Sequence, residues 1–438
     1  YMYASQEMEP GSGWDYTSLL NNLAANPDQD GAQLGEKVCR EYYDHCADYG
    51  FGSQRSATFS IIDLSKIDDV LISMNEAFRV VYEQGDLGDV TRAVLEADSF
   101  GGNSVSEGYS NMLDLGNMLD QLSGYGQEVR DASQTLQSCI LYTMNGRLHK
   151  NASGLSVYYP VSIQGSEELK IFSRICPSNY YYALIDKIAY GAENGSAADY
   201  DNSTLLSDMA DINEWLGEES GFTGDVSTNA GEFADIEIGQ MGVSDIYFDE
   251  DGIYTVSFDN MDELAYACCS VGMDDDADGF FYLGTTEEVI YDIDRNCVTD
   301  NFDGSWPCIN DNLLALELVN TTDSCSIYTC NVLLNDEVET NLRIEYDWEY
   351  DEWSVIGIWD GIDEETGMAS REVYELQDGD VITPAYYWFS VDDDEDWYYG
   401  DDIVVDGDLE ITYEYLPEGV YYYCFELHDI YGNVYYTP

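Results

Sequence analysis

Positively charged side chains are scarce in this sequence of 438 residues. Lysine and arginine together number 15 and histidine 3, against 88 aspartates and glutamates, and the formal net charge is −73. Because such a charge repels phosphate backbones and anionic lipid surfaces, we expect no binding to nucleic acid and an attraction for cationic partners or divalent ions. The sequence also lacks a run of about eighteen apolar residues, so no membrane span is expected.

The shortage of basic residues is greatest in the second half of the chain. Residues 1–190 hold 12 Lys and Arg against 26 Asp and Glu, a balance of −14, whereas residues 191–438 hold 3 against 62, a balance of −59. Apolar residues still make up 45% of the chain, so the acidity does not indicate disorder. The length suffices for two or three domains. Since high charge favours solubility outside the cell, we predict an extracellular, secreted protein.

Recognisable cysteine and histidine motifs are missing as well. The eleven cysteines follow no CxxC-type spacing, and the three histidines are too few and too scattered to form a metal cluster with them. Disulfides of the secreted type are plausible in the acidic half, where Cys325 and Cys330 are a candidate pair. His45 and Cys46 are neighbours in a predicted helix, where consecutive side chains point about 100° apart, so we expect no thiol–imidazole pair there.

The segment that the sequence singles out lies near its first residue. Residues 1–4 are a short apolar run that predicts a strand, and residues 16–26 carry leucines at helical spacing. Residues 5–15 therefore form a strand-to-helix loop, and in α/β sheets such loops at the carboxyl ends of the strands commonly line ligand sites. The alternative is that Asp15 only caps the helix and Trp14 plugs the loop.

This loop resembles part of a known family. The sequence Ala-Ser-Gln-Glu-Met-Glu-Pro-Gly-Ser-Gly-Trp-Asp-Tyr at residues 4–16 is similar to the segment that follows the catalytic cysteine in the clostripain family of cysteine peptidases. Residues 109–116, 152–160 and 180–190 agree with the resemblance, and Asp114 within them is expected to have a structural role. The resemblance implies a caspase-like fold and cleavage after Arg or Lys by a Cys paired with a His.

In that family both catalytic residues lie upstream of the motif, so no catalytic residue is assigned in this sequence. The chain opens inside a predicted core strand and shows no signal peptide, so we expect a fragment or processed piece. Its expected partner is the N-terminal portion of the same peptidase, which carries the Cys and His, and the chain alone is predicted to be inactive. Its expected substrates are polypeptides that contain Arg or Lys.

A pocket for a substrate Arg or Lys needs a carboxylate at its foot, because a guanidinium is held best by a bidentate acidic partner. Asp15 stands on the loop next to the strand that would follow the missing nucleophile. We predict that Asp15 forms a wall of this substrate-binding pocket, with Glu7 as the second candidate and Trp14 packing nearby.

Helices and strands alternate in residues 1–191. Residues 57–64 predict a strand, and Ser65 is expected to begin a helix with an acidic residue three positions later, as in a capping box. Amphipathic helices are also predicted for residues 31–49 and 127–142. Together with the resemblance, these elements predict an α/β fold, the C-terminal half of a caspase-like sheet with flanking helices.

A linker and an acidic region follow. Residues 192–220 are predicted to form a linker with a short helix. In residues 221–438 short alternating runs are separated by Asp-Gly and Gly-Asn turn signals, and tyrosines alternate with acidic residues, which gives each strand one aromatic and one charged face. We predict an all-β, sandwich- or barrel-like region that ends in an immunoglobulin-like sandwich.

One acidic segment has the spacing of a calcium loop. Asp274, Asp276 and Asp278 alternate and are followed by Gly279, as in the first half of an EF-hand. The twelfth position is Thr285 instead of glutamate, so the EF-hand pattern fails. A looser calcium site and a solvated acidic turn both remain open. The resemblance also implies calcium as a cofactor, though not at these residues.

Two other functions remain open from the sequence. The first is a secreted, calcium-dependent binding or adhesion protein, in which the acidic β region holds calcium or a cationic ligand. The second is an inactive paralogue of the peptidase. The sequence of the polypeptide upstream of Tyr1 would distinguish the enzyme from both alternatives, because only the enzyme requires the catalytic Cys and His there.

Overall fold

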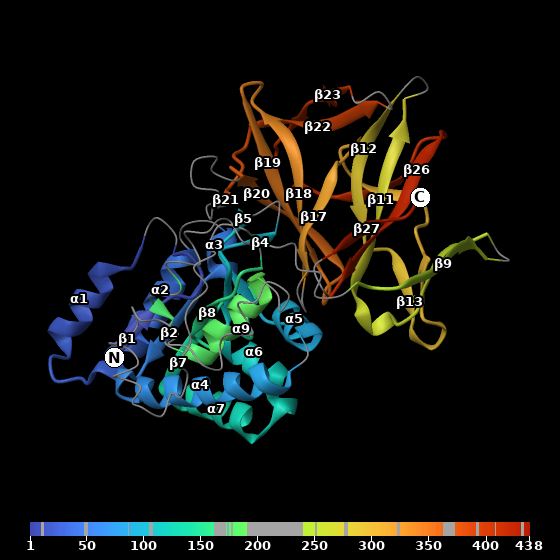
Figure 1. Cartoon of the computed structure of the whole chain (residues 1–438). Coiled ribbons are helices and arrows are strands. Elements are labelled where there is room, and N and C mark those ends of the chain that lie inside the picture. The colour runs from blue at the N-terminus through green and yellow to red at the C-terminus, as the bar shows by residue number, and fades with distance from the viewer. Residues whose placement is uncertain are drawn as a thin grey trace. The chain divides into compact units, whose positions relative to one another are not determined.

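Two compact units make up the described part of the chain (Figure 1). The structure is a computed structural model that describes residues 1–9, 13–47, 51–85, 87–104, 108–161, 172, 175, 176, 178–190, 240–249, 252–275, 279–321, 325–361, 373–390, 394–407, 409–430 and 433–438. We call the unit formed by most of residues 1–239 the α/β unit, and the unit formed by most of residues 240–438 the β unit. The linker and short helix predicted for residues 192–220 lie outside the described residues.

The α/β unit combines helices with short strands. Its helices are α1 (Tyr16–Ala25), α2 (Gly31–Cys46), α3 (Phe51–Ser56), α4 (Ile67–Gln84), α5 (Leu87–Leu95), α6 (Leu115–Gln121), α7 (Gln127–Cys139) and α9 (Asn179–Tyr190). Its 3-10 turns are η2 (Leu64–Lys66), η3 (Leu122–Tyr125) and η4 (Arg147–His149). Its strands are β1 (Met2–Ala4), β2 (Thr58–Ile62), β3 (Ser99–Phe100), β4 (Asn103–Ser104), β5 (Gly108–Tyr109), β6 (Met112–Asp114), β7 (Ile140–Asn145) and β8 (Ser156–Tyr158).

A three-stranded sheet in the order β1-β2-β7 lies between helices in this unit (Figure 1). All five residues of β2 are buried. Successive residues of a strand point to opposite faces, and accordingly Phe59 and Ile61 pack with α2 while Ile62 joins the core of α4, α7 and α9. Both pairings in the sheet are antiparallel, so the end of β1 at Ala4 lies beside the beginning of β2. A second sheet has the order β3-β6-β8.

The boundaries of two predicted helices were wrong. The helix predicted to reach residue 142 ends at Cys139, and residues 140–145 form β7 in the central sheet. Ile140 and Leu141 continue the apolar stripe of the helix, so periodicity alone did not reveal the change to a strand. The predicted capping box at Ser65 is absent too: α4 begins after Lys66, while the amide of Ser65 donates to the carboxylate of Asp63.

The β unit consists of strands and short 3-10 turns in its described part. The strands are β9 (Val243–Phe248), β10 (Tyr254–Phe258), β11 (Leu264–Asp274), β12 (Gly279–Thr286), β13 (Val289–Asp292), β14 (Cys297–Asp300), β15 (Ser305–Ile309), β16 (Asn312–Leu313), β17 (Leu316–Thr321), β18 (Cys325–Leu334), β19 (Val338–Asp347), β20 (Glu352–Trp359), β21 (Val373–Tyr374), β22 (Val381–Ser390), β23 (Glu395–Tyr399), β24 (Ile403–Val404), β25 (Thr412–Tyr415), β26 (Tyr421–Asp429) and β27 (Val434–Tyr436). The turns are η9 (Met261–Glu263) and η10 (Ile293–Arg295).

The largest sheet of the β unit closes into a barrel-like ring. Strand β22 pairs with both β12 and β18, and β17 also pairs with both of these strands. A ring of β18, β17, β12 and β22 results, and Ile382 of β22 belongs to the buried core beside it. The predicted barrel-like form of the acidic region is thus present, whereas the immunoglobulin-like sandwich at its end stays a prediction.

The predicted disulfide is wrong. Cys325 and Cys330 both lie on β18, five residues apart, which separates their Cα atoms by about 16 Å at the rise of a strand. A disulfide requires Cα atoms within about 7 Å. All eleven cysteines are free thiols, ten of them buried. In the described part of the chain, no helix combines the length and apolar character needed to cross a membrane.

Candidate functional site

Three anchors fix the Ser-Gln-Glu segment that follows β1, and the first is the hydroxyl of Thr58. The Oγ1 atom of Thr58 accepts hydrogen bonds from the amides of Gln6 at 3.0 Å and Glu7 at 2.8 Å. The hydroxyl of Ser5 lies 3.0 Å from the same atom. Thr58 is the first residue of β2 and is buried. The antiparallel pairing of β1 and β2 therefore places this hydroxyl where the loop begins.

The side chain of Gln6 is the second anchor and joins two distant segments. Its Nε2 atom donates to Oδ2 of Asp114 at 2.9 Å, and its Oε1 atom accepts from the amide of Gly154 at 2.8 Å. Asp114 also accepts from the amides of Ser153 at 2.7 Å and Asn117 at 2.9 Å. Burial raises the pKa of Asp114 against the opposing effect of these hydrogen bonds. The contacts agree with the structural role expected of Asp114, which caps α6.

The carboxylate of Glu7 is the third anchor. Only 6% of Glu7 is exposed. Its carboxylate accepts from the amide of Met8 at 2.7 Å and from the amide of Gly101, 3.1 Å from each oxygen. Its Oε2 atom lies 3.4 Å from Nε2 of His149. Glu7, the second candidate for the pocket wall, therefore has a buried carboxylate that contacts groups of the protein itself.

His149 lies between two carboxylates, and we call this group the Glu7–His149–Asp98 cluster. Its Nδ1 atom is 2.9 Å from Oδ1 of Asp98, and its ring packs against Phe100 at 5.1 Å between ring centres. Burial disfavours the charged imidazole, but hydrogen bonds and charge from Asp98 and Glu7 outweigh burial and raise the pKa of His149 to about 9. A histidine that is charged near pH 7 does not serve as a general base.

Asp15, the first candidate for the pocket wall, caps α1. Its Oδ1 atom accepts from the amide of Ser18 at 3.0 Å, and the hydrogen bonds from Ser18 lower the pKa of its carboxyl group. Trp14 packs edge-on against Phe59 at 5.2 Å, and its Nε1 atom donates to Glu9 at 3.0 Å. The contacts of Asp15 are thus those of a helix cap. A role of Asp15 in substrate binding stays a prediction.

The thiols of this chain do not have the surroundings of a nucleophile. Thiolate is the nucleophilic form of cysteine, and burial in apolar surroundings disfavours it. Burial raises the pKa of Cys46 to about 11 and the pKa of Cys39 to about 12. Cys46 packs with Tyr42 and Phe59 in the core below α2, which agrees with the expectation that His45 and Cys46 form no catalytic pair.

The predicted calcium loop is described only at its beginning. Asp274 accepts from the hydroxyl of Tyr422 at 3.0 Å. Asp276 and Asp278 lie outside the described residues. Among the residues that the structure does describe, no group of three His, Cys, Asp or Glu side chains is arranged to hold a metal ion. Calcium stays a prediction.

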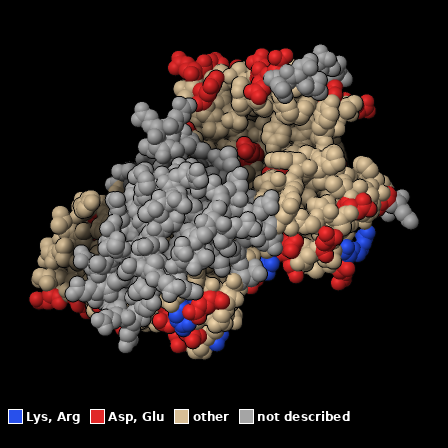
Figure 2. All heavy atoms as spheres, viewed as in Figure 1, with Lys and Arg blue, Asp and Glu red and all other residues tan. Residues whose placement is uncertain are grey.

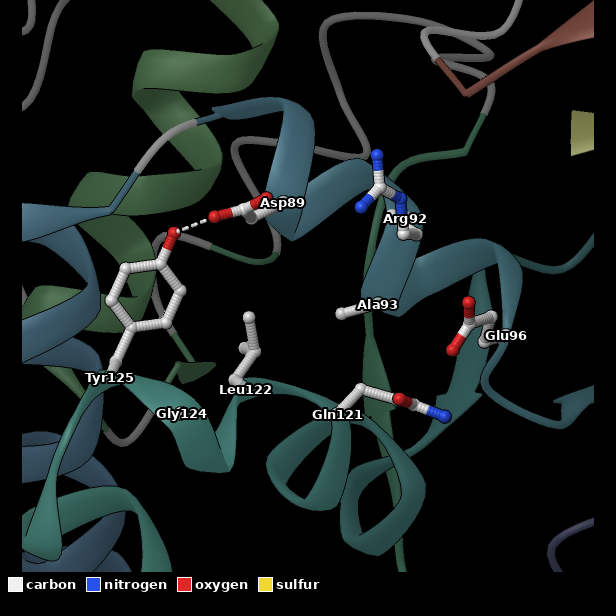
Figure 3. Close-up of a pocket in the computed structure, with 8 residues that line it drawn as sticks. All are labelled: Asp89, Arg92, Ala93, Glu96, Gln121, Leu122, Gly124 and Tyr125. Atoms are coloured by element: carbon white, nitrogen blue, oxygen red, sulfur yellow. Dashed lines mark hydrogen bonds between the residues drawn. The ribbon is translucent and has the colours of Figure 1, made fainter. Parts of the chain in front are cut away.

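A separate, open cavity of about 360 Å³ lies between α5 and η3. Figure 3 shows Leu122 and Tyr125 of η3 facing Asp89 and Ala93 of α5, and the hydroxyl of Tyr125 donates to Asp89 at 2.5 Å. None of the lining residues belongs to the three anchors. The cavity therefore adds nothing to the site formed by the loop after β1.

Sequence reasoning did not find Thr58, Asp98 or His149. Thr58 begins β2, Asp98 directly precedes β3 and His149 ends η4, and all three are polar and buried or partly buried. A buried polar side chain requires a partner, so polar residues that interrupt apolar runs were the available signal. The partners themselves lie too far away in the sequence to be recognised from a local pattern.

A comparison with models of known protein families agrees with the motif. Residues 1–200 match the model of the clostripain family. A solved structure that is similar to the chain, a B. fragilis cysteine protease, has 11% sequence identity and a TM-score of 0.27, over 44% of this chain and 77% of that chain. No curated protein matches the chain. Residues 1–200 are thus similar in sequence to the clostripain family.

Proposed function

We propose that residues 1–200 form the part of a clostripain-like cysteine endopeptidase that follows its catalytic cysteine, and that the enzyme cleaves polypeptides after Arg or Lys. The N-terminal portion of the same peptidase supplies the Cys and His. One observation carries this proposal: the segment from Ser5 to Glu7, which belongs to the most specific of the family-like stretches, is held by three anchors. A segment positioned this firmly is suited to lining a site.

The chemistry available in this chain supports a non-catalytic role. Its described thiols are buried or half-buried, and its buried histidine is held as a cation by Glu7 and Asp98. Cysteine peptidases need a thiolate beside a histidine that exchanges protons. The nucleophile and the base are therefore assigned to the N-terminal portion, and this chain alone is expected to hydrolyse nothing.

Asp15 remains the proposed carboxylate for the substrate cation. Only Oδ1 of Asp15 accepts the hydrogen bond from the amide of Ser18. The side chain is partly exposed, so its carboxylate can meet a ligand. Glu7 is less suited, because its carboxylate is surrounded by amides and His149. Trp14 stands beside Asp15 and provides an aromatic wall. We further propose that the enzyme is secreted, consistent with its acidity, and that calcium is a cofactor.

The experiment combines the full chain with the separately expressed N-terminal portion. Fluorogenic peptides with Arg, Lys, Gln or Ala before the scissile bond are incubated with each polypeptide alone and with the complex. We expect cleavage only by the complex and only after Arg or Lys. A folded complex that cleaves none of the peptides would refute the proposal, and equal cleavage of all four would refute the specificity.

A further inference from the structure

Five aromatic rings form a continuous row across the outer face of the β unit. Successive ring centres are separated by 5.3, 5.7, 3.7 and 4.7 Å. The strands that carry these rings are β23, β22, β12 and β26, and β11 lies between the last two (Figure 1). We call it the aromatic ladder, and its members are Trp397, Tyr387, Phe389, Phe280 and Tyr422.

The strand register explains why these rings share one face. Residues directly opposite each other in an antiparallel pair point to the same side, and Tyr387 is paired with Trp397 while Phe389 is paired with Phe280. Strand β11 lies between the strands of Phe280 and Tyr422, and it pairs Asp274 with Phe280 and Gly272 with Tyr422. A Cβ atom on Gly272 would lie 2.8 Å from the ring of Phe280. The glycine therefore leaves room for the ladder to cross β11.

Packing within the sheet leaves the ends of the ladder open. Trp397 is 44% exposed and Tyr422 is 46% exposed. Strand β23 pairs with β22 alone among the described strands, and all five of its residues are exposed. Aromatic pairs across strands stabilise a sheet when they are covered. Here only the two end rings are exposed, and the three rings between them are half-buried. Exposed rings at the ends of such a row offer flat surfaces to a ligand.

Carboxylates adjoin the ladder at both ends. Tyr422 donates its hydroxyl hydrogen to Asp274 at 3.0 Å, and Tyr387 donates to Glu395. These hydrogen bonds raise the pKa of both tyrosines. Asp and Glu side chains also gather at the edge of the unit that carries β22 and β23 (Figure 2). The surface thus combines π faces with negative charge.

This combination selects a particular class of ligand. Cations are attracted to the faces of Trp and Tyr, and guanidinium groups both stack on rings and bind carboxylates. Neutral ligands can only donate hydrogen bonds to the carboxylates, whereas cations also gain the attraction of opposite charge. Anions are repelled by the balance of −59 in residues 191–438. We propose that the aromatic ladder binds cationic polypeptide segments, whose Arg or Lys side chains lie over the rings and reach Asp274 and Glu395. This binding site is separate from the peptidase function proposed above.

Binding is tested on the full chain by fluorescence anisotropy. The probe is a fluorescein-labelled peptide with the sequence Gly-Arg repeated four times, and its control has citrulline, a neutral isostere of arginine, at every Arg position. The double variant Tyr387→Ala/Trp397→Ala keeps the net charge and removes two rings. We expect about tenfold weaker binding of the Arg peptide to this variant, with no change for Tyr415→Ala, which alters an exposed tyrosine of a different sheet.

A second variant tests the charge without removing a ring. Glu395 is exposed, so Glu395→Gln should leave the fold intact, as thermal unfolding checks. We expect several-fold weaker binding of the Arg peptide and a shallower dependence of that binding on salt.

Unchanged binding of the Arg peptide to the double aromatic variant would overturn the proposal, because overall charge would then explain the attraction. Equal binding of the citrulline peptide, or displacement by a neutral oligosaccharide such as cellohexaose, would also overturn it. No cleavage is measured, so these results do not bear on the peptidase proposal.

Discussion

At the scale of single residues, one buried hydroxyl holds the backbone near the beginning of the family motif. Thr58 accepts hydrogen bonds from two consecutive amides of the loop, those of Gln6 and Glu7. Amides that are buried without a partner cost far more than an ordinary hydrogen bond contributes. The loop conformation therefore depends on a residue 51 or 52 positions away in the sequence.

Replacing Thr58 with Val should destabilise the α/β unit. Valine keeps the shape but removes the acceptor, so the two amides lose the hydrogen bonds to Thr58, and a buried amide that loses its acceptor costs about 1–3 kcal/mol. Urea unfolding should show a loss of about 2 kcal/mol or more, together with faster hydrogen exchange in residues 5–9. Thr58→Ser keeps the hydroxyl and serves as the control. If Val were as stable as Ser at this position, the proposed anchor would be unimportant.

Asp15 allows its two possible roles to be separated. Asn caps helices as well as Asp does, whereas Ala costs about 1 kcal/mol. In the complex with the N-terminal portion, Asp15→Asn should keep the stability and lower kcat/KM for Arg peptides at least tenfold, because the charge is lost. Full activity of Asp15→Asn with reduced stability of Asp15→Ala would leave capping as the only role of this residue.

The limits of prediction are visible at this scale. The helix after the loop followed from leucine spacing, a local signal, and the structural role of Asp114 was expected from its place in the family resemblance. The anchors did not, because Glu7 and Gly101 are 94 residues apart and Gln6 and Gly154 are 148 apart. Hydrophobic periodicity identifies the buried face of an element and carries no information about its polar partners elsewhere.

At the scale of elements, the Glu7–His149–Asp98 cluster joins the loop after β1 to β3 and η4. Glu7 belongs to the loop, Asp98 precedes β3, and His149 ends η4. Removing one member of a buried charged group leaves the others uncompensated. The cluster therefore makes the position of the loop depend on the protonation of one histidine.

The stability of this cluster should decrease at alkaline pH. The pKa of His149 is about 9 in the folded chain and about 6.5 in an unfolded one, so the folded state binds more protons between these values. The stabilisation is complete below pH 6.5 and is lost as pH rises through 9. It amounts to about 3 kcal/mol by the size of the shift.

Hydrogen exchange of residues 5–9, corrected for its intrinsic pH dependence, measures this effect. Protection should fall between pH 6.5 and 9 in the native protein, and His149→Gln should show lower and nearly pH-independent protection. His45→Gln, which changes an unrelated histidine, should behave as the native protein does. A pH profile that survives the loss of His149 would assign the titration to another group.

The change from α7 to β7 shows a further limit at this scale. The apolar residues Ile140 and Leu141 fit either the end of the helix or the beginning of a strand, and the strand is selected because β7 completes the sheet beside β2. Tertiary pairing overrides local periodicity here. In the acidic region, by contrast, turn signals at short intervals predicted the many strands, although not that β22 closes the ring.

At the scale of the whole molecule, two units of different character share one chain. The α/β unit carries the family motif, and the β unit carries most of the negative charge and the aromatic ladder. We propose different tasks for them: the first completes a peptidase site, and the second binds cationic segments of a polypeptide. The peptidase assignment depends on a nucleophile that comes from the N-terminal portion, because the thiols of this chain are buried or half-buried.

The most direct measurement locates that nucleophile. The complex of this chain with the N-terminal portion is treated with a peptide that ends in an arginine chloromethyl ketone, which alkylates an activated cysteine, and each polypeptide is then analysed by mass spectrometry. We predict one label on a cysteine of the N-terminal portion and none on this chain. A label on any of the eleven cysteines described here would contradict the account.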